Sequence, residues 1–346
     1  MTQQISSYRD AGVDIDQANL AKKKIKRLAR RTFTPGVLAE IGGFGGLFAL
    51  DHDRKSQSVL VASVDGVGTK LKIAFVTGVH TTVGRDLVAH CVNDILVQGA
   101  RPLFFMDYIA TGKLSPGVVA EVVEGIAAGC KEAGCALLGG ETAEMPGFYQ
   151  EGEYDLAGFI VGTVDKRKII DGSAIRPGNV ILGLPSAGLH TNGYSLARKL
   201  LLESAGYTVD THLPALNTTV GKALLAPHVN YLPVLEPLIA KGLVKGLAHI
   251  TGGGLTENIP RILPPRCTAR IRQGSLPVLP IFNLLQRLGN IPEQVMLRTF
   301  NMGIGMVLFV SDQDLAKVER HFKSRRKKVY RIGEVSTGAG KVVYKP

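Results

Sequence analysis

The segment with the clearest capacity for chemistry is a short run of acidic, glycine and basic residues. It reads Asp65, Gly66, Val67, Gly68, Thr69 and Lys70. The apolar run at residues 58–64 before it predicts a buried strand that ends at Asp65. A carboxylate at the end of a strand, glycines that admit a ligand close to the backbone, and a lysine within reach of phosphate indicate nucleotide chemistry. A simple hairpin turn would explain the same segment, and neither the P-loop nor the dinucleotide-binding glycine pattern occurs.

A second carboxylate, Asp94, falls within a predicted helix at residues 86–98 that is otherwise largely apolar. His90, Asp94 and Gln98 are four residues apart, so they share one face of that helix. An acid in apolar surroundings is costly to bury without a cation or a hydrogen-bond partner. Magnesium binds oxygen ligands, so Asp65 and Asp94 could hold Mg²⁺ against a triphosphate. The alternative is that Asp94 is a local cap or an ion-pair partner.

Further polar residues accompany glycine-rich segments. Residues 41–48 contain four glycines and predict a loop or a tight strand turn, with Gly43 and Gly45 at its centre. Glu141 follows another predicted strand and two glycines, although acids at such positions are common on surfaces. His190 follows a turn that opens a helix, where an anion could bind. For His190 and His249, ligand contact and a purely structural role both stay open.

The elements that must position these residues alternate between strands and helices. Strands are predicted at residues 103–110, 158–164 and 180–184, and residues 136–142 are predicted to be a strand that runs into glycines. A loop is predicted at 78–84, and a helix opens at Ser115 and Pro116 and runs towards Ala133. The chain has 346 residues, which exceeds the usual size of a single core. We place the boundary between two domains near residues 166–178, which divides the chain into 1–170 and 171–346.

Composition excludes several classes of protein. Hydrophobic residues make up 45% of the chain and no low-complexity tract occurs, which indicates a globular protein. The polar N-terminus lacks the apolar segment of a signal peptide, and no apolar run is long enough to cross a bilayer, so we expect a cytoplasmic protein with no membrane partner. The cysteines form no C-x-x-C pair, so we expect small buried residues and not disulfides or zinc ligands.

The net charge of +12 raises the question of nucleic-acid binding. Two basic clusters carry much of it, at residues 22–31 and 323–328. In the first, Ile25 and Leu28 are three residues apart, as in an amphipathic helix with one solvated face. No zinc pattern and no aromatic ribonucleoprotein motif accompanies the clusters, and anionic small substrates also suit a basic protein. We therefore expect no nucleic-acid partner.

Taken together, these segments resemble the phosphoribosylformylglycinamidine cyclo-ligases, also called aminoimidazole ribonucleotide synthetases. The resemblance is nearly full length. It covers residues 8–16, 42–46, 65–70, 91–102, 111–113, 139–147, 192–196, 249–260 and 298–301. Departures lie in segments such as 207–220 and in the basic C-terminal region.

The resemblance implies an α+β protein of two domains, each with a mixed sheet and helices. The N-terminal domain would bind ATP and form a homodimer, and the C-terminal domain would complete the substrate cleft. The implied metal ligands are Asp65 and Asp94, for Mg²⁺. The implied nucleotide-binding residues are Gly43, Gly45, Asp65, Gly66, Gly68, Thr69, Lys70, Asp94 and Glu141, and the implied catalytic residues are Lys70, His190 and His249.

The implied reaction is the ATP-dependent closure of the imidazole ring from formylglycinamidine ribonucleotide. ATP would phosphorylate the formyl oxygen, a substrate nitrogen would attack the iminophosphate, and phosphate would leave. The alternatives are another ATP-using member of the same superfamily or a basic RNA-binding module. Selenophosphate synthetases commonly carry a reactive cysteine or selenocysteine with a nearby lysine in the N-terminal glycine loop, and residues 42–48 contain neither.

Overall fold

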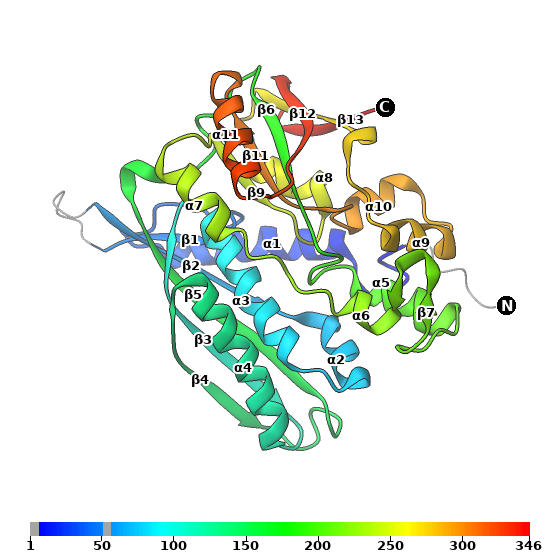
Figure 1. The fold of residues 1–346 in the computed structure, drawn as a ribbon. Helices are drawn as coiled ribbons and strands as arrows, with labels where there is room; N and C mark the ends of the chain where they lie inside the picture. Colours follow the sequence, from blue (N-terminus) through cyan, green and yellow to red (C-terminus); the bar gives the residue numbers. More distant parts are fainter. Residues whose placement is uncertain (1–6, 51–56) are drawn as a thin grey trace.

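The computed structural model describes residues 7–50 and 57–346, which form two large sheets with associated helices and one short sheet of two strands (Figure 1). The first sheet has the strand order β1-β2-β5-β3-β4 and the second has the order β13-β10-β12-β6-β11-β9. Both are mixed: in the first, only β3 and β4 pair in parallel, and in the second, only β10 and β13 do. The predicted α+β class with a mixed sheet in each half is confirmed.

The elements of the N-terminal half are α1 (Ile15–Ala29), β1 (Gly46–Ala49), β2 (Ser58–Gly66), α2 (Leu71–Thr77), α3 (Thr81–Leu96), β3 (Arg101–Thr111), α4 (Pro116–Ala133), β4 (Ala136–Glu144) and β5 (Tyr154–Asp165). The segment from residue 166 to residue 179 then connects the two sheets.

The elements of the C-terminal half are β6 (Val180–Pro185), α5 (Tyr194–Arg198), β7 (His212–Leu213), β8 (Thr218–Thr219), α6 (Val220–Leu224), α7 (Leu232–Ala240), β9 (Gly246–His249), α8 (Gly254–Asn258), β10 (Cys267–Arg272), α9 (Pro280–Gly289), α10 (Glu293–Thr299), β11 (Ile304–Val310), α11 (Asp312–Ser324), β12 (Tyr330–Thr337) and β13 (Lys341–Lys345). A π-helical turn over Lys199–Ser204 continues α5.

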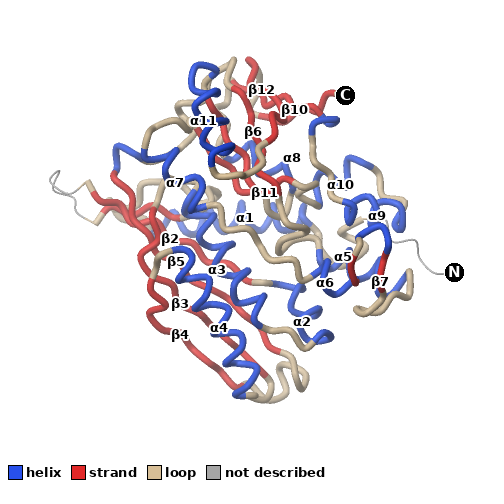
Figure 2. Tube along the Cα trace, in the orientation of Figure 1, coloured by secondary structure: helices blue, strands red, loops and turns tan. Residues whose placement is uncertain are grey.

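Helices α3 and α4 lie side by side on one face of the first sheet (Figure 2). Two glycines allow this close approach. A Cβ atom at Gly84 would lie 2.2 Å from the Val122 carbonyl oxygen, and one at Gly125 would lie 1.9 Å from the Thr81 carbonyl oxygen. Any larger residue would force the helices apart. The other face of the sheet exposes large apolar side chains, among them Val64, Met106, Tyr108, Leu138 and Phe159.

Several local expectations need correction. Helix α3 begins at Thr81, not near Asp86, so part of the loop expected at 78–84 is helical; packing against α4 stabilises that extra turn. Gly139, Gly140 and Glu141 lie within β4, because pairing with β3 extends the strand through the glycines to Glu144.

Helix α1 buries no residue, and Leu20, Ile25 and Leu28 are 50%, 51% and 53% exposed. The apolar face expected there is therefore solvated like the basic face. Ion pairs near its two ends, from Asp16 to Arg298 and from Arg30 to Glu40, hold the helix instead.

A hydrophobic core of buried side chains runs from the first sheet, through α3, into the second sheet. A smaller core joins α5, α6, α9 and α10. Three of the four cysteines are buried, Cys135 is half-buried, and all four are free, as expected. In the described part of the chain, no helix combines the length and the apolar character that a membrane span requires.

Candidate functional site

The carboxyl end of β2 faces helix α3 at the junction of the two halves. Ser63 and Asp65 are two residues apart on β2, so their side chains leave the same face of the strand. Ser63 Oγ bonds to Asp94 Oδ2 at 3.2 Å, and Asp65 Oδ2 lies 2.7 Å from His90 Nε2. His90 and Asp94 are one helical turn apart on α3. The two carboxylates are thus held beside the same imidazole.

The C-terminal half adds three histidines to this cluster. His249, at the end of β9, places Nδ1 2.8 Å from Asp94 Oδ1 and Nε2 3.0 Å from His228 Nε2. His190 stacks on His228 with ring centroids 4.1 Å apart. All four imidazoles are buried, and Thr191 links the two halves through a 2.6 Å hydrogen bond to His90 Nδ1. We call His90, His190, His228 and His249 the histidine cluster.

The histidine cluster contains one imidazole whose pKa is raised and two whose pKa values are strongly lowered. Burial acts to lower the pKa of His90, but the Asp65 carboxylate, helped by Asp94 and Asp86, outweighs it and raises the pKa to about 9. Burial lowers the pKa of His190 and of His228 well below the usual value, and neighbouring cations add to that effect. At neutral pH one imidazolium therefore lies between carboxylates, and His190 and His228 are neutral.

The same residues have the chemistry of a metal site. Ligand atoms of His90, Asp94 and His249 all lie within 4.8 Å of one another. Two imidazoles and a carboxylate suit a transition metal, whereas Mg²⁺ prefers oxygen. Asp65 and Asp94 offer carboxylate oxygens, and the Asp65 side chain is 38% exposed, so a ligand can reach it. A divalent cation and the His90 imidazolium would compete for the Asp65 carboxylate. The carboxylate oxygens of Asp65 and Asp94 are the part of this donor set that has the chemistry Mg²⁺ prefers.

A glycine loop before β1 borders this cluster. Gln98, one turn after Asp94, donates a 3.1 Å hydrogen bond to the Gly45 carbonyl. A Cβ at Gly45 would lie 2.9 Å from Gln98 Oε1 and 3.0 Å from the Ala62 carbonyl oxygen, so a larger residue there would displace the Gln98 side chain. The loop, including Gly43, lines a cavity of about 480 Å³ that continues to Ser63 and Val64. The glycine loop predicted from the sequence is therefore hydrogen-bonded to Gln98, which lies just after the helix that carries Asp94.

Arg261 from the C-terminal half holds this loop. Its Nε donates to the Gly42 carbonyl at 3.3 Å, its Nη2 donates to the Gly43 carbonyl, and its guanidinium lies 3.8 Å from the centre of the Phe44 ring. Its Nη1 donates to Asn258 Oδ1 at 3.0 Å. Asn258 in turn bonds to the carbonyls of Gly252 and Gly254. The glycine segments at 42–45 and 252–254 are thus connected through two side chains.

Lys70 is placed differently from the expectation that it would reach a phosphate. Its ammonium is fully buried, 2.6 Å from Asp86 Oδ2 and 2.8 Å from the Ala226 carbonyl oxygen. Asp86 Oδ1 also accepts a 2.7 Å hydrogen bond from the backbone N–H of His228. Lys70 therefore supports the segment that carries His228, because its charge is already paired inside the protein.

The remaining residues predicted to bind nucleotide lie in two places. Asp65 Oδ1 accepts a 2.7 Å hydrogen bond from the Gly66 N–H, and Gly68 has a φ of 68° where the chain turns into α2. Thr69 Oγ1 lies 3.1 Å from Ser195 Oγ of the C-terminal half. Glu141 is separate: it pairs with Tyr108 in the sheet and lines a cavity of about 460 Å³ on the face away from α3.

Sequence reasoning missed His228, Thr191 and Arg261. His228 has no periodic context that would mark it, since it lies in the irregular segment before α7. Arg261 directly follows the 249–260 stretch, whose glycines indicate a constrained backbone. Thr191 lies 101 residues from its partner His90, and Arg261 lies 218 residues from Gly43. His228 lies 21 residues from His249, with no regular element that spans the two. Spacing along the sequence therefore does not indicate these contacts.

Comparisons with known proteins agree with this architecture. Residues 47–164 match the family model of the AIR synthase related protein N-terminal domain, and residues 176–345 match that of the C-terminal domain. Among solved structures, thiamine-monophosphate kinase from Stenotrophomonas maltophilia aligns with a TM-score of 0.62 over 92% of this chain and 93% of that one, at 19% identity. Hydrogenase maturation protein HypE in complex with ATP aligns with a TM-score of 0.60 over 82% and 81%, also at 19% identity. The fold is therefore that of the AIR synthase related proteins.

Proteins of similar sequence identify the family to which this chain belongs. The phosphoribosylformylglycinamidine cyclo-ligase of Syntrophotalea carbinolica is 54% identical over 96% of this chain and 95% of that protein. The enzyme of the same name from Geobacter metallireducens is 55% identical over 95% of each. The chain belongs to the phosphoribosylformylglycinamidine cyclo-ligase family. It is an enzyme of purine biosynthesis, a ligase of class EC 6.3.3.1.

Proposed function

We propose that this enzyme converts formylglycinamidine ribonucleotide to aminoimidazole ribonucleotide, with ATP as the phosphoryl donor and Mg²⁺ as the cofactor, in the cytoplasm. The observation that carries this proposal is the convergence of Asp65 and Asp94 with histidines from both halves, next to the Gly43–Gly45 loop. The names of the relatives supply the substrate. The ATP complex of the structurally similar HypE supports ATP.

In this proposal, the formyl oxygen of the substrate attacks the γ-phosphorus of ATP and ADP leaves. A substrate nitrogen then attacks the carbon of the resulting iminophosphate, phosphate leaves, and the ring is closed. Mg²⁺ held by Asp65 and Asp94 would neutralise charge on the phosphates. The protein residues bind and orient the two reactants, as in phosphoryl transfer generally.

Other residues have supporting roles in the proposal. Gly43, Gly45, Gly66, Gly68 and Thr69 provide backbone close to the nucleotide. His249 is oriented by Asp94 and His190 by the Ala187 N–H, so the two imidazoles proposed as catalytic are held in fixed positions within the histidine cluster. Lys70 acts through Asp86 on the position of His228.

The test is an assay for phosphate release from purified protein. We expect release to require both ATP and formylglycinamidine ribonucleotide, and to require Mg²⁺. Release with ATP alone, or release unaffected by the ribonucleotide, would reject the proposed reaction. Salt-dependent RNA binding without any turnover would favour the basic RNA-binding module instead.

Arg261 gives a first prediction for this reaction. Arg261→Gln removes the hydrogen bonds to the glycine loop, so we expect the KM for ATP to rise about tenfold, about 1.4 kcal/mol of binding, with a smaller change in kcat. Arg261→Lys should recover little, since lysine lacks the planar fork that contacts two carbonyls and a ring. Arg331→Gln, which breaks an exposed pair with Glu319, is the matched control. Equal KM values in all three variants would contradict the role of Arg261.

We also propose a homodimer formed through the first sheet. The face away from α3 exposes Val64 at 56%, Leu138 at 63% and Phe159 at 52%, an apolar surface that a second copy would cover. Glu141 lies on the same face. Light scattering at micromolar concentration should give twice the chain mass of 37.0 kDa. Phe159→Arg should shift the mass towards that of one chain, whereas Val76→Arg, at an exposed apolar residue of α2, should not. A mass of one chain for the parent protein would reject the dimer.

The basic cluster at residues 323–328 should be dispensable for the reaction. It ends α11 and begins the next turn, and its hydrogen bonds and ion pairs involve no residue of the histidine cluster. Neutralising residues 325–328 together should leave turnover within about threefold, which is less than about 1 kcal/mol. Loss of activity with an unchanged circular dichroism spectrum would show that this surface takes part.

A further inference from the structure

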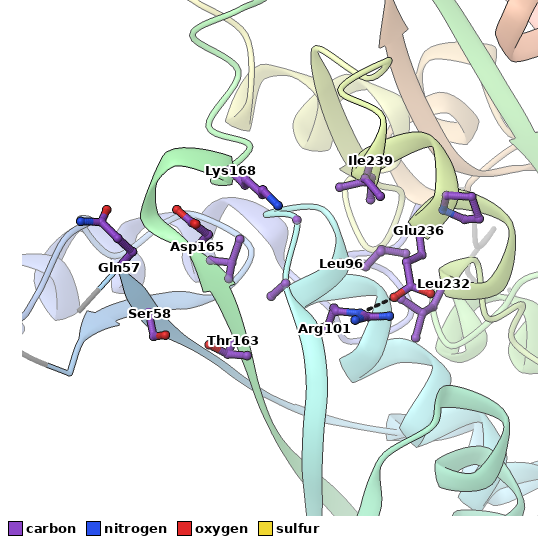
Figure 3. A pocket seen from close by; sticks show the side chains of 15 residues that line it. Gln57, Ser58, Leu96, Arg101, Thr163, Asp165, Lys168, Leu232, Glu236 and Ile239 are labelled. Carbon is purple, nitrogen blue, oxygen red and sulfur yellow. Dashed lines mark hydrogen bonds and ion pairs between the residues drawn. The ribbon is translucent and has the colours of Figure 1, made fainter. Parts of the chain in front are cut away.

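A cavity of about 550 Å³ lies between the two halves, away from the histidine cluster (Figure 3). Its floor comes from the end of α3 and the start of β3, one wall from the end of β5, and the opposite wall from α7. Small-molecule sites in proteins have volumes of this order and occur preferentially at domain junctions. The proposed reaction uses none of the residues that line it.

The walls of this interdomain cavity are largely apolar. Leu96 at the end of α3, Val164 on β5, and Leu232 and Ile239 on α7 all face it. The two walls belong to different halves of the chain. A ligand with an apolar body would therefore remove apolar surface from water on both sides at once.

Four charged side chains line the cavity, and three are already neutralised. Arg101 and Glu236 form an ion pair across the two halves, drawn as a dashed line in Figure 3. Asp165 is paired with Arg167 at 2.9 Å. Lys168 makes no side-chain hydrogen bond or ion pair with the described residues, and its side chain extends towards the α7 side of the cavity (Figure 3). The Lys168 charge helps to lower the pKa of the Asp165 carboxylate, but less than Arg167 does, so Lys168 is the charged residue of the cavity lining that forms no ion pair among the described residues.

We propose that this cavity binds a small organic monoanion with an apolar body, a carboxylate or sulfonate on an aromatic or branched aliphatic group. The apolar body lies between Leu96 and the α7 residues, and the anionic group pairs with Lys168. Because the ligand contacts both halves, it stabilises the folded arrangement in which they meet. The proposal does not depend on the reaction proposed above.

The test uses anilinonaphthalene sulfonate, which has aromatic rings and one sulfonate group. Titration of the parent protein, followed by fluorescence and by the melting temperature, should show saturable binding. Lys168→Met should raise the Kd about tenfold, since it removes the charge and keeps the length of the side chain. Ala240→Phe, which fills the cavity, should raise the Kd at least as much. Lys166→Met is the matched control: it removes the same charge two residues away, outside the cavity.

The exposed apolar face of the first sheet is the competing site for this probe. Phe159→Ser removes an aromatic side chain from that face. It should leave the saturable binding of anilinonaphthalene sulfonate unchanged. If Phe159→Ser abolishes that saturable binding, or if Lys168→Met and Lys166→Met weaken binding equally, the proposal is overturned. Circular dichroism of each variant shows that it is folded. Lys168→Met, a change at an exposed residue, keeps the test valid if Ala240→Phe fails to fold.

Discussion

Replacing Asp94 with Asn is expected to lower turnover by about two orders of magnitude or more and to leave the melting temperature close to that of the parent. Asn preserves the size of the side chain and can still bond to Ser63 and His249, the two partners of Asp94. It removes the negative charge that would face Mg²⁺ and the nucleotide phosphates. A hundredfold loss corresponds to roughly 2.7 kcal/mol of transition-state stabilisation.

The alternative role of Asp94 gives a different result. If Asp94 only supports the local structure, the lost hydrogen bonding costs about 1 kcal/mol of stability and leaves the chemistry largely intact. Measuring the melting temperature together with Mg²⁺-dependent turnover separates the two roles. Asp65→Asn is the companion variant, since Asp65 is the other proposed ligand. Near-normal turnover of both variants at saturating Mg²⁺ and ATP would mean that the metal site lies elsewhere.

Lys70→Met is expected to lower the free energy of unfolding by about 3–5 kcal/mol, because it leaves the Asp86 carboxylate buried without its cation. Both side chains of the pair are 0% exposed, so water cannot replace the ammonium. Urea denaturation of the parent and the variant measures the difference.

Two further variants make the Lys70 result specific. Lys72→Met breaks the pair with Glu153, in which the lysine side chain is 39% exposed, and should cost at most about 1 kcal/mol. Adding Asp86→Leu to Lys70→Met removes the stranded charge and should recover part of the lost stability. An unfolding free energy within about 1 kcal/mol of the parent for Lys70→Met alone would show that the pair is not as strongly coupled as its geometry indicates.

The sequence by itself determined those features whose signals are local. The apolar run at residues 58–64 marked β2, and the Ser115-Pro116 start marked α4, which ends where Gly134 adopts a left-handed φ of 69°. Helical spacing placed His90 and Asp94 on one face of α3. These signals are local because strand alternation and helical periodicity depend on residues only a few positions apart.

Only the tertiary structure decided which residues these strand and helix faces contact. His249 reaches Asp94 and Arg261 reaches the glycine loop through packing between the two halves, which no spacing in the chain records. Lys70 is buried because α3 presents Asp86 to it, and Glu141 lies on the outer face because β4 pairs with β3 in a register that faces it away from α3. The sequence could name the residue types of the site, but their partners depend on contacts between distant segments, and these form only when the two sheets share one core.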